Sequence, residues 1–256
     1  MELILDRFNL KRVIGLSKIA VVDEWRPYLL TGTIIGLLIF FSGVFLKSAS
    51  IGFLLNIMLL AGIVQVSKVF SETHQKEKGI YYFMLPASIE EKYLVKLLST
   101  LIGYYIFALL VCLLSNQLSI LIAGFLYQSS DIPGFNPLQP EFFERFKLYL
   151  FFHSIFFAGS LFFRKNSFLK TVLVFFAVSI LLTISAGSYL KNLFVQSRSG
   201  QSSFYLHFDS MGDITQGIGG SLGSYVATLQ VVAFVVIPLV LYGVSFLKFK
   251  NSEIRG

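Results

Sequence analysis

The stretch SETHQKEKGIYYFMLPASIEEKYLVKLL, residues Ser71–Leu98, decides how this chain is organised. It lies between two apolar runs, SIGFLLNIMLLAGIVQV at positions 50–66 and LLSTLIGYYIFALLVCLL at positions 97–114. Nine of its residues are Lys, Glu or His, in a chain that is only 14% charged. A turn between two buried helices needs only a few residues. The length and polarity of this connection therefore indicate a structure of its own, outside the apolar part of the protein.

The apolar part of the chain is large enough to need a bilayer as its solvent. The 256 residues are 55% hydrophobic and include 28 Phe and 12 Tyr. A helix crosses the hydrocarbon core with about 20 apolar residues. We predict an all-α integral membrane protein with six transmembrane helices, of which two runs are short. The six runs are Tyr28–Leu46, Ile51–Val66, Leu97–Leu114, Leu148–Phe163, Thr171–Ala186 and Tyr225–Leu247.

A further apolar piece follows the third run. After Ser115, Asn116 and Gln117 the chain continues as LSILIAGFLY at positions 118–127. A piece of this length is too short to cross a bilayer as a second helix. The sequence therefore predicts a bend or a re-entrant segment at this point.

The basic residues predict the orientation. With six spans, 16 of the 21 Lys and Arg residues fall on one side and five on the other. Cytoplasmic segments carry the excess of Lys and Arg, so both termini and the opening loop are expected in the cytoplasm. The majority side comprises Arg7, Lys11, Arg12, Lys18, Arg26, Lys68, Lys76, Lys78, Lys92, Lys96, Arg164, Lys165, Lys170, Lys248, Lys250 and Arg255. The minority side comprises Lys47, Arg145, Lys147, Lys191 and Arg198. The net charge of +7 then reflects topology and attraction to membrane lipid, not binding of nucleic acid.

The segment before the first run has the pattern of an amphipathic helix. Apolar residues between Leu10 and Val21 share a stripe at helical spacing. Trp25, Arg26 and Pro27 follow, and Trp favours the headgroup level of a membrane. We expect a helix on the inner surface that turns at these three residues into the first span. A disordered basic tail is the alternative interpretation.

The whole chain is interpreted as a single transmembrane domain, residues 1–256. Residues 1–27 form the surface helix, residues 67–96 the cytoplasmic loop, and residues 187–224 an outer loop rich in Ser and Gly.

Several kinds of chemistry are missing from the sequence. No Asp, Glu, Lys or Arg lies deep in the six runs, which argues against an ion-driven transporter. The H-E-x-x-H pair of metalloproteases, the G-x-S-x-G elbow and the G-x-x-x-x-G-K-[ST] phosphate loop are all absent. His153 is the one imidazole at membrane depth, and we expect it to be a hydrogen-bonded interior residue near the outer end of the fourth span. The chain is therefore not expected to be an enzyme, to bind a cofactor or to hold a metal.

The opening loop can be divided into short pieces. Gly79 breaks the polar end of the second helix, and IYYFM at positions 80–84 is an aromatic patch. LPAS at positions 85–88 then turns the chain. Ser88 followed by Glu91 fits a capping box, so a helix is predicted from Ile89 into the third span without interruption. We expect a helical projection whose aromatic patch docks a soluble partner, or alternatively dips back into the headgroup layer.

These residues carry a resemblance. The chain resembles the membrane permease subunits of ABC transporters in the ABC-2 type exporter superfamily. KGIYYFMLPASIEEKYLVKLL at positions 78–98 is similar to that family's cytoplasmic stretch between spans two and three. LFFRKNSFLKT at positions 161–171 and FLKFKNSEIRG at positions 246–256 also resemble six-span bacterial members.

The resemblance implies a bacterial inner-membrane exporter that acts as a dimer with a second copy or a related permease. It implies a coupling helix in the opening loop and a separate ABC ATPase subunit, present in two copies, which binds ATP and magnesium. A membrane scaffold without transport and a lipid-modifying membrane enzyme are the alternatives. The residues expected to couple to the ATPase are Lys78, Gly79, Tyr81, Tyr82, Phe83, Pro86 and Glu90.

Overall fold

The computed structural model is all-helical in the part of the chain that it describes. That part comprises residues 9–46, 51–71, 73, 79, 82, 84–127, 136, 139–198 and 231–253. Its seven α-helices are α1 (Leu10–Leu46), α2 (Ile51–Val66), α4 (Ile89–Leu98), α5 (Tyr104–Tyr127), α6 (Pro140–Phe162), α7 (Ser167–Arg198) and α10 (Ile237–Glu253). Two π-helical turns, η2 (Ser99–Gly103) and η3 (Val232–Val236), precede α5 and α10.

The helices identify the chain as a multi-pass membrane protein. Four helical segments of the described chain are long and apolar enough to cross a bilayer: Arg26–Phe45, Ile89–Tyr127, Ser167–Ser185 and Val232–Asn251. They correspond to the first, third, fifth and sixth predicted spans. Helix α2 has the predicted bounds, but its 16 residues are fewer than a bilayer crossing requires. Length and hydropathy therefore show four of the six expected spans.

The predicted bend after Leu114 is wrong. Helix α4, the turn η2 and helix α5 form one continuous helical segment from Ile89 to Tyr127. Of the three polar residues that suggested a bend, Ser115 lies against Gly36 of α1, Asn116 is buried and Gln117 is exposed on the continuous helix. The single Ser119 hydroxyl lies within hydrogen-bond distance of two carbonyl oxygens, that of Ser115 at 2.8 Å and that of Phe40 in α1 at 3.3 Å. Small polar side chains of this kind let two membrane helices approach closely, so they need not interrupt the helix.

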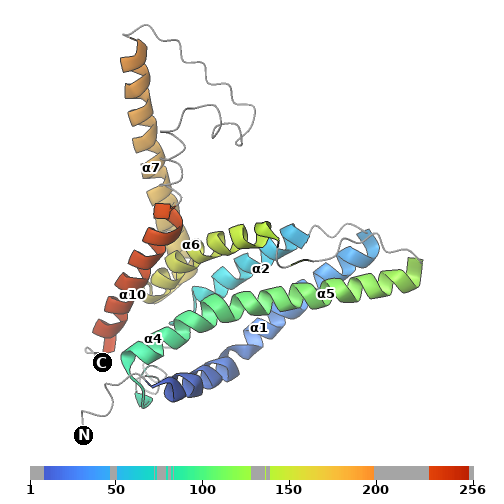
Figure 1. Ribbon diagram of the computed structural model, residues 1–256. Helices are drawn as coiled ribbons and strands as arrows, with labels where there is room; N and C mark the ends of the chain where they lie inside the picture. Colours follow the sequence, from blue (N-terminus) through green and yellow to red (C-terminus); the bar gives the residue numbers. More distant parts are fainter. Residues whose placement is uncertain are drawn as a thin grey trace.

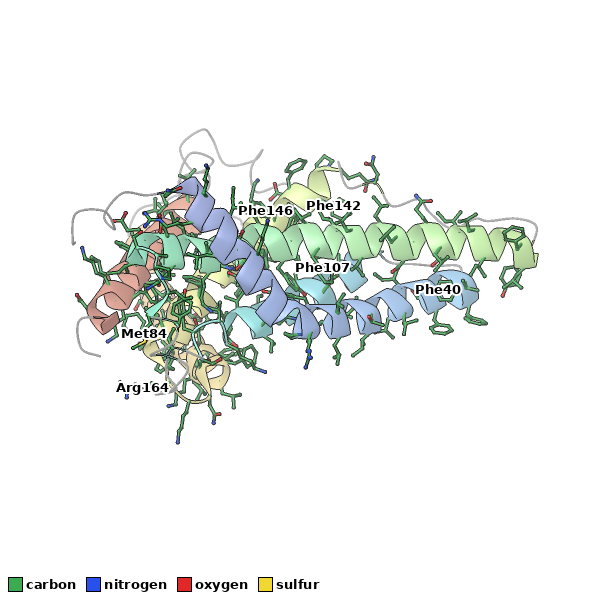
Figure 2. The ribbon with its side chains drawn as sticks, turned by 90° about the horizontal axis from the view of Figure 1, so that it is seen from below. Phe40, Met84, Phe107, Phe142, Phe146 and Arg164 are labelled. Carbon is green, nitrogen blue, oxygen red and sulfur yellow. The ribbon has the colours of Figure 1, made fainter. Side chains whose placement is uncertain are left out.

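Helix α1 runs without a break through the turn predicted at Trp25–Pro27. Arg26 and Pro27 are exposed, and the side chain of Trp25 lies outside the described residues. Pro27 lies inside the helix, and it removes one backbone hydrogen bond. Figure 2 shows that α1 changes direction along its length, as a proline in a helix causes. The surface segment and the first span are therefore one bent helix from Leu10 onward.

The bend is braced by the neighbouring helix α2. The Gln65 amide donates to the Pro27 carbonyl at 3.3 Å and to the Thr31 hydroxyl oxygen at 2.6 Å. The Thr31 hydroxyl in turn donates to the same Pro27 carbonyl. Gln65 thus bonds across the two helices α1 and α2.

The packing of the helices can be followed in Figure 1. Helices α1, α2 and α5 lie side by side, and α6 packs on α2 and α10. Aromatic side chains fill this core, and Tyr104, Tyr149 and Phe157 are among its most buried members. Helix α7 packs beside α6 only at its start and then leaves the bundle. Its apolar segment Ser167–Ser185 is almost entirely exposed. It ends only at Arg198, so the first part of the predicted outer loop is helical, while residues 199–230 lie outside the described residues.

Candidate functional site

The candidate site is the start of α4, where the opening loop enters the helical core. Ser88 has extended backbone angles and caps the helix: its hydroxyl oxygen accepts from the Glu91 amide at 3.2 Å. The Glu91 carboxylate accepts from the Ser88 amide at 3.0 Å. Both halves of the predicted capping box are present, so this prediction is confirmed.

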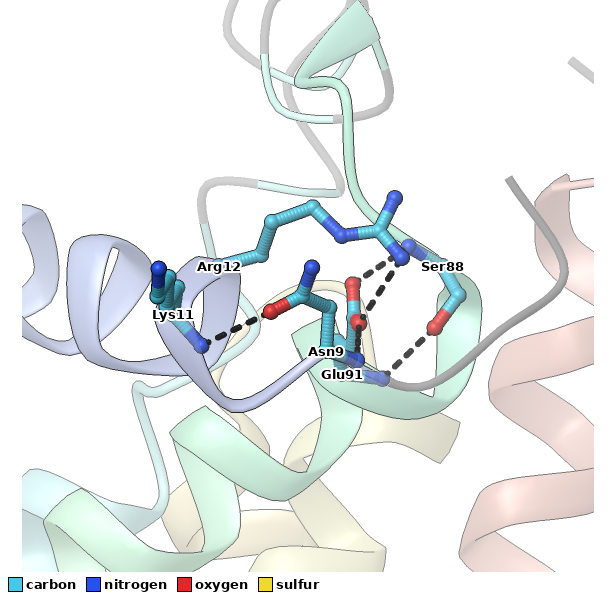
Figure 3. Close-up of polar contacts among 5 residues, drawn as sticks. All are labelled: Asn9, Lys11, Arg12, Ser88 and Glu91. Carbon is cyan, nitrogen blue, oxygen red and sulfur yellow. Dashed lines mark hydrogen bonds and ion pairs between the residues drawn. The ribbon is translucent and has the colours of Figure 1, made fainter. Parts of the chain in front are cut away.

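The same carboxylate also holds the start of α1, as Figure 3 shows. Its second oxygen accepts from the backbone amide of Asn9 at 2.7 Å and lies 3.3 Å from Nη2 of Arg12. Asn9 itself caps α1, because its side-chain oxygen accepts from the Lys11 amide at 3.0 Å. Glu91 is fully buried, so its hydrogen bonds are strong and its loss would leave several donors unpaired. One carboxylate therefore joins the starts of two helices, through Asn9 and Glu91, which are 82 residues apart in the sequence.

The basic residues of α4 also point inward. Lys92 and Lys96 are buried, and Nζ of Lys96 donates to the Val69 carbonyl at 3.0 Å. Tyr82 lies against them: Nζ of Lys96 is 5.1 Å from the centre of its ring, and its hydroxyl donates to the Lys92 carbonyl at 3.2 Å. Tyr82 is thus half-buried against its own chain, a contact that the sequence did not predict. A contact of Tyr82 with a partner stays a prediction.

Several described residues around the turn of the loop are exposed. Met84 is 75% exposed, and Pro86 and Glu90 are also exposed. Gly79 is buried, and a Cβ there would lie only 2.9 Å from the Thr73 carbonyl oxygen, which explains why this position has no side chain. Lys78, Tyr81 and Phe83 lie outside the described residues.

A network of buried polar groups lies behind α4, and the partners of His153 in it were not predicted from the sequence. Nε2 of His153 in α6 is 2.9 Å from Oγ1 of Thr100 in η2, and its Nδ1 is 2.8 Å from the Tyr242 hydroxyl in α10. The Thr100 hydroxyl donates to the Lys96 carbonyl at 2.7 Å. Because that hydroxyl hydrogen is used, we assign the Nε2–H tautomer to His153, which donates to Thr100 and accepts from Tyr242. These hydrogen bonds join α4, η2, α6 and α10.

His153 is an interior hydrogen-bonded residue, as expected, but its position is not as expected. It is fully buried in the middle of α6, beside the joint between α4 and α5, and not near an outer helix end. Tyr149, one turn before it, donates to the Thr100 carbonyl at 2.8 Å. The π-helical turn that carries Thr100 is therefore held from α6 at both its side chain and its backbone. Such turns are often found at functional sites.

Among the described residues no group of three His, Cys, Asp or Glu side chains could hold a metal ion. Comparison with protein-family models, with curated proteins and with solved structures finds no match.

Proposed function

We propose that this chain is the membrane permease subunit of an ATP-driven bacterial ABC exporter of the ABC-2 type. Its six spans would form the translocation path with a second copy or a related permease, in the inner membrane with both termini in the cytoplasm. Two separate ATPase subunits would bind ATP and magnesium and dock on the opening loop.

The observation that supports this proposal best is the uninterrupted helix from Ile89 to Tyr127. At 1.5 Å per residue its 39 residues extend about 58 Å, and the hydrocarbon core is only about 30 Å thick. The polar part of this segment is α4, so α4 is the part that extends beyond the bilayer. A partner that pushes on the exposed turn at Met84, Pro86 and Glu90 would therefore move a rigid rod that continues into the membrane.

The buried contacts of α4 would distribute this movement. Glu91 connects the loop to the bent helix α1, and the chain through Thr100 and His153 connects it to α6 and α10. Met84 lies toward one end of the molecule and Phe40 toward the other in Figure 2. The end that holds Met84 also holds the starts of α1 and α4 and the end of α10 in Figure 1. This arrangement agrees with a single cytoplasmic face.

The proposal is tested by capture of the ATPase. The tagged chain is purified from its host in mild detergent, and co-purified proteins that carry a phosphate-loop motif are identified by mass spectrometry. Met84→Asp with Glu90→Lys changes only exposed side chains, so the protein should fold and insert normally. Truncation of an interface anchor typically costs about 2 kcal/mol or more, which weakens binding about thirtyfold.

The matched control is Glu144→Lys, an exposed position at the start of α6 whose pair with Lys147 lies on the surface. It should retain the ATPase. Co-purification of a partner without a phosphate loop would favour the scaffold interpretation. Retention of the ATPase by the Met84 and Glu90 variant would show that the turn does not bind it.

A further inference from the structure

Two stretches that the proposed function does not use meet at one corner of the molecule. The first is the turn between α6 and α7 within LFFRKNSFLKT, and the second is the end of α10 within FLKFKNSEIRG. Nζ of Lys248 in α10 lies 5.7 Å from the centre of the Phe162 ring. Nζ of Lys170 in α7 lies 5.9 Å from the centre of the Phe163 ring. Two lysines from different helices therefore flank two adjacent aromatic rings.

The corner carries a concentrated positive charge. Arg164 and Lys165 follow the aromatic pair directly, and both are exposed together with Lys170 and Lys248. The ion pairs within the described part of the chain are Arg12 with Glu91 and Lys147 with Glu144, so no described carboxylate neutralises these four cations. Four exposed cations that no described carboxylate neutralises attract an anion.

The turn that presents these cations is fixed in place. Asn166 adopts a left-handed conformation with φ of 53° in the turn between α6 and α7. The Ser167 hydroxyl donates to the Ser67 carbonyl and so ties the turn to the end of α2. Gly159 lies so close to the Thr171 side chain that a Cβ there would overlap it, and this close approach sets the two helices together. The backbone that carries three of these cations is therefore held in place without a ligand.

The position of the corner selects the anion. The apolar segment Ser167–Ser185 begins here and the apolar segment Val232–Asn251 ends here, so the corner lies at a membrane surface. Phe162 is 48% exposed beside the cations, so an apolar surface lies next to the positive charge. A ligand that presents a negative charge at this depth, with apolar chains against the helices below, is an anionic phospholipid.

We propose that Phe162, Phe163, Arg164, Lys165, Lys170 and Lys248 form a binding site for one anionic phospholipid headgroup. The four cations hold the phosphate group, and the two rings cover the glycerol region beneath it. The site depends on the ends of α6, α7 and α10 and not on the proposed docking of an ATPase. Arg164 lies in Figure 2 at the same end of the molecule as Met84, so the proposed orientation places the lipid in the inner leaflet.

The test measures which lipids stay bound to the purified full-length chain. The protein is exchanged into micelles that contain equal amounts of phosphatidylglycerol and phosphatidylcholine, and the retained lipids are counted by native mass spectrometry. The wild-type chain should retain phosphatidylglycerol in preference. Lys170→Gln with Lys248→Gln should weaken that preference by about fivefold for each charge removed.

Two further variants keep the result interpretable. Arg164→Gln with Lys165→Gln alters only exposed turn residues, and it should lose the preference to a similar degree if the lysine variant fails to fold. Lys18→Gln with Lys147→Gln removes the same charge from exposed positions elsewhere and should leave the preference unchanged.

Three outcomes would overturn the proposal. An equal loss in the Lys18 and Lys147 control would show a diffuse charge effect without a site. An unchanged preference in the variants of the corner would show that the lipid binds elsewhere. Retention of the lipid together with loss of a co-purified ATPase would make this corner a protein contact. Failure of the ATPase experiment alone would leave the lipid site intact, because the two experiments change different residues.

Discussion

Glu90 and Glu91 are neighbours in the sequence with opposite surroundings, and they provide a direct test of the joint between α1 and α4. Glu90 is exposed, whereas Glu91 is fully buried and accepts from the amides of Asn9 and Ser88. Glu91→Gln places an amide donor where an acceptor is needed and removes the charge opposite Arg12. We expect the free energy of unfolding to fall by about 1.5–3 kcal/mol, measured by denaturant unfolding in mixed micelles.

Glu90→Gln is the control for this measurement and should change stability by less than about 0.5 kcal/mol. Equal effects of the two substitutions would contradict the assignment of Glu91 as the joint between the two helix starts.

The hydrogen-bond chain through His153 gives a second prediction at this scale. Thr100→Val keeps the shape of the side chain and removes the hydroxyl oxygen to which Nε2 of His153 donates. A buried donor without a partner costs about 1–3 kcal/mol, so this substitution should lower the free energy of unfolding by that amount. Thr183→Val is the matched control, because Thr183 is exposed on α7 and donates only to the Ser179 carbonyl of its own helix. A stable Thr100→Val protein would mean that His153 is satisfied in another way.

At the scale of single elements, features set by neighbouring residues could be predicted from the sequence, whereas features set by contacts between helices could not. The capping box at Ser88 and Glu91 could be predicted because its two hydrogen bonds join residues three positions apart. The bend after Leu114 was predicted wrongly because Ser115 and Asn116 were interpreted as breaks, whereas Asn116 is buried and Ser119 bonds to α1. The π-helical turn η2 left no signal, because its wider hydrogen-bond register is imposed by Tyr149 and His153 from α6.

The packing of α2 on α5 gives a prediction for a whole element. Gly62 in α2 faces the ring of Tyr104, and a Cβ there would overlap that ring. The ring is not free to move away, because it is buried and its hydroxyl donates to the Met58 carbonyl at 2.7 Å. Gly62→Ala should therefore push α2 from α5 and lower the free energy of unfolding by about 1–3 kcal/mol.

Gly124 in α5 is the matched control, because a Cβ there meets nothing within 4 Å. Gly124→Ala should be neutral or slightly stabilising, since Ala favours a helix by about 1 kcal/mol over Gly. If Gly62→Ala is equally harmless in the same unfolding measurement, α2 does not pack on Tyr104 as described.

At the scale of the molecule, the sequence predicted the kind of protein but not how its parts meet. The lengths of the apolar runs and the positions of the basic residues can be read directly from the sequence. They predict a membrane protein and which of its segments face the cytoplasm. Which residue meets which across the fold depends on side-chain shape. The contact of Glu91 with Asn9 and that of Lys248 with Phe162 both join distant segments, and neither had a signal in the sequence.

The orientation of the whole molecule can be tested with the continuous helix from Ile89 to Tyr127, because one rigid element fixes both sides. Met84 lies just before its start and Tyr127 at its end, and both are exposed. In a Cys112→Ser background, which removes the single buried cysteine, Met84→Cys and Tyr127→Cys each provide one thiol. A membrane-impermeant maleimide should label Tyr127→Cys in spheroplasts of the bacterial host, and Met84→Cys only after the inner membrane is permeabilised. Labelling of Met84→Cys in intact spheroplasts would place the opening loop outside the cell, where no ATPase could reach it, and the proposed function would fall with that result.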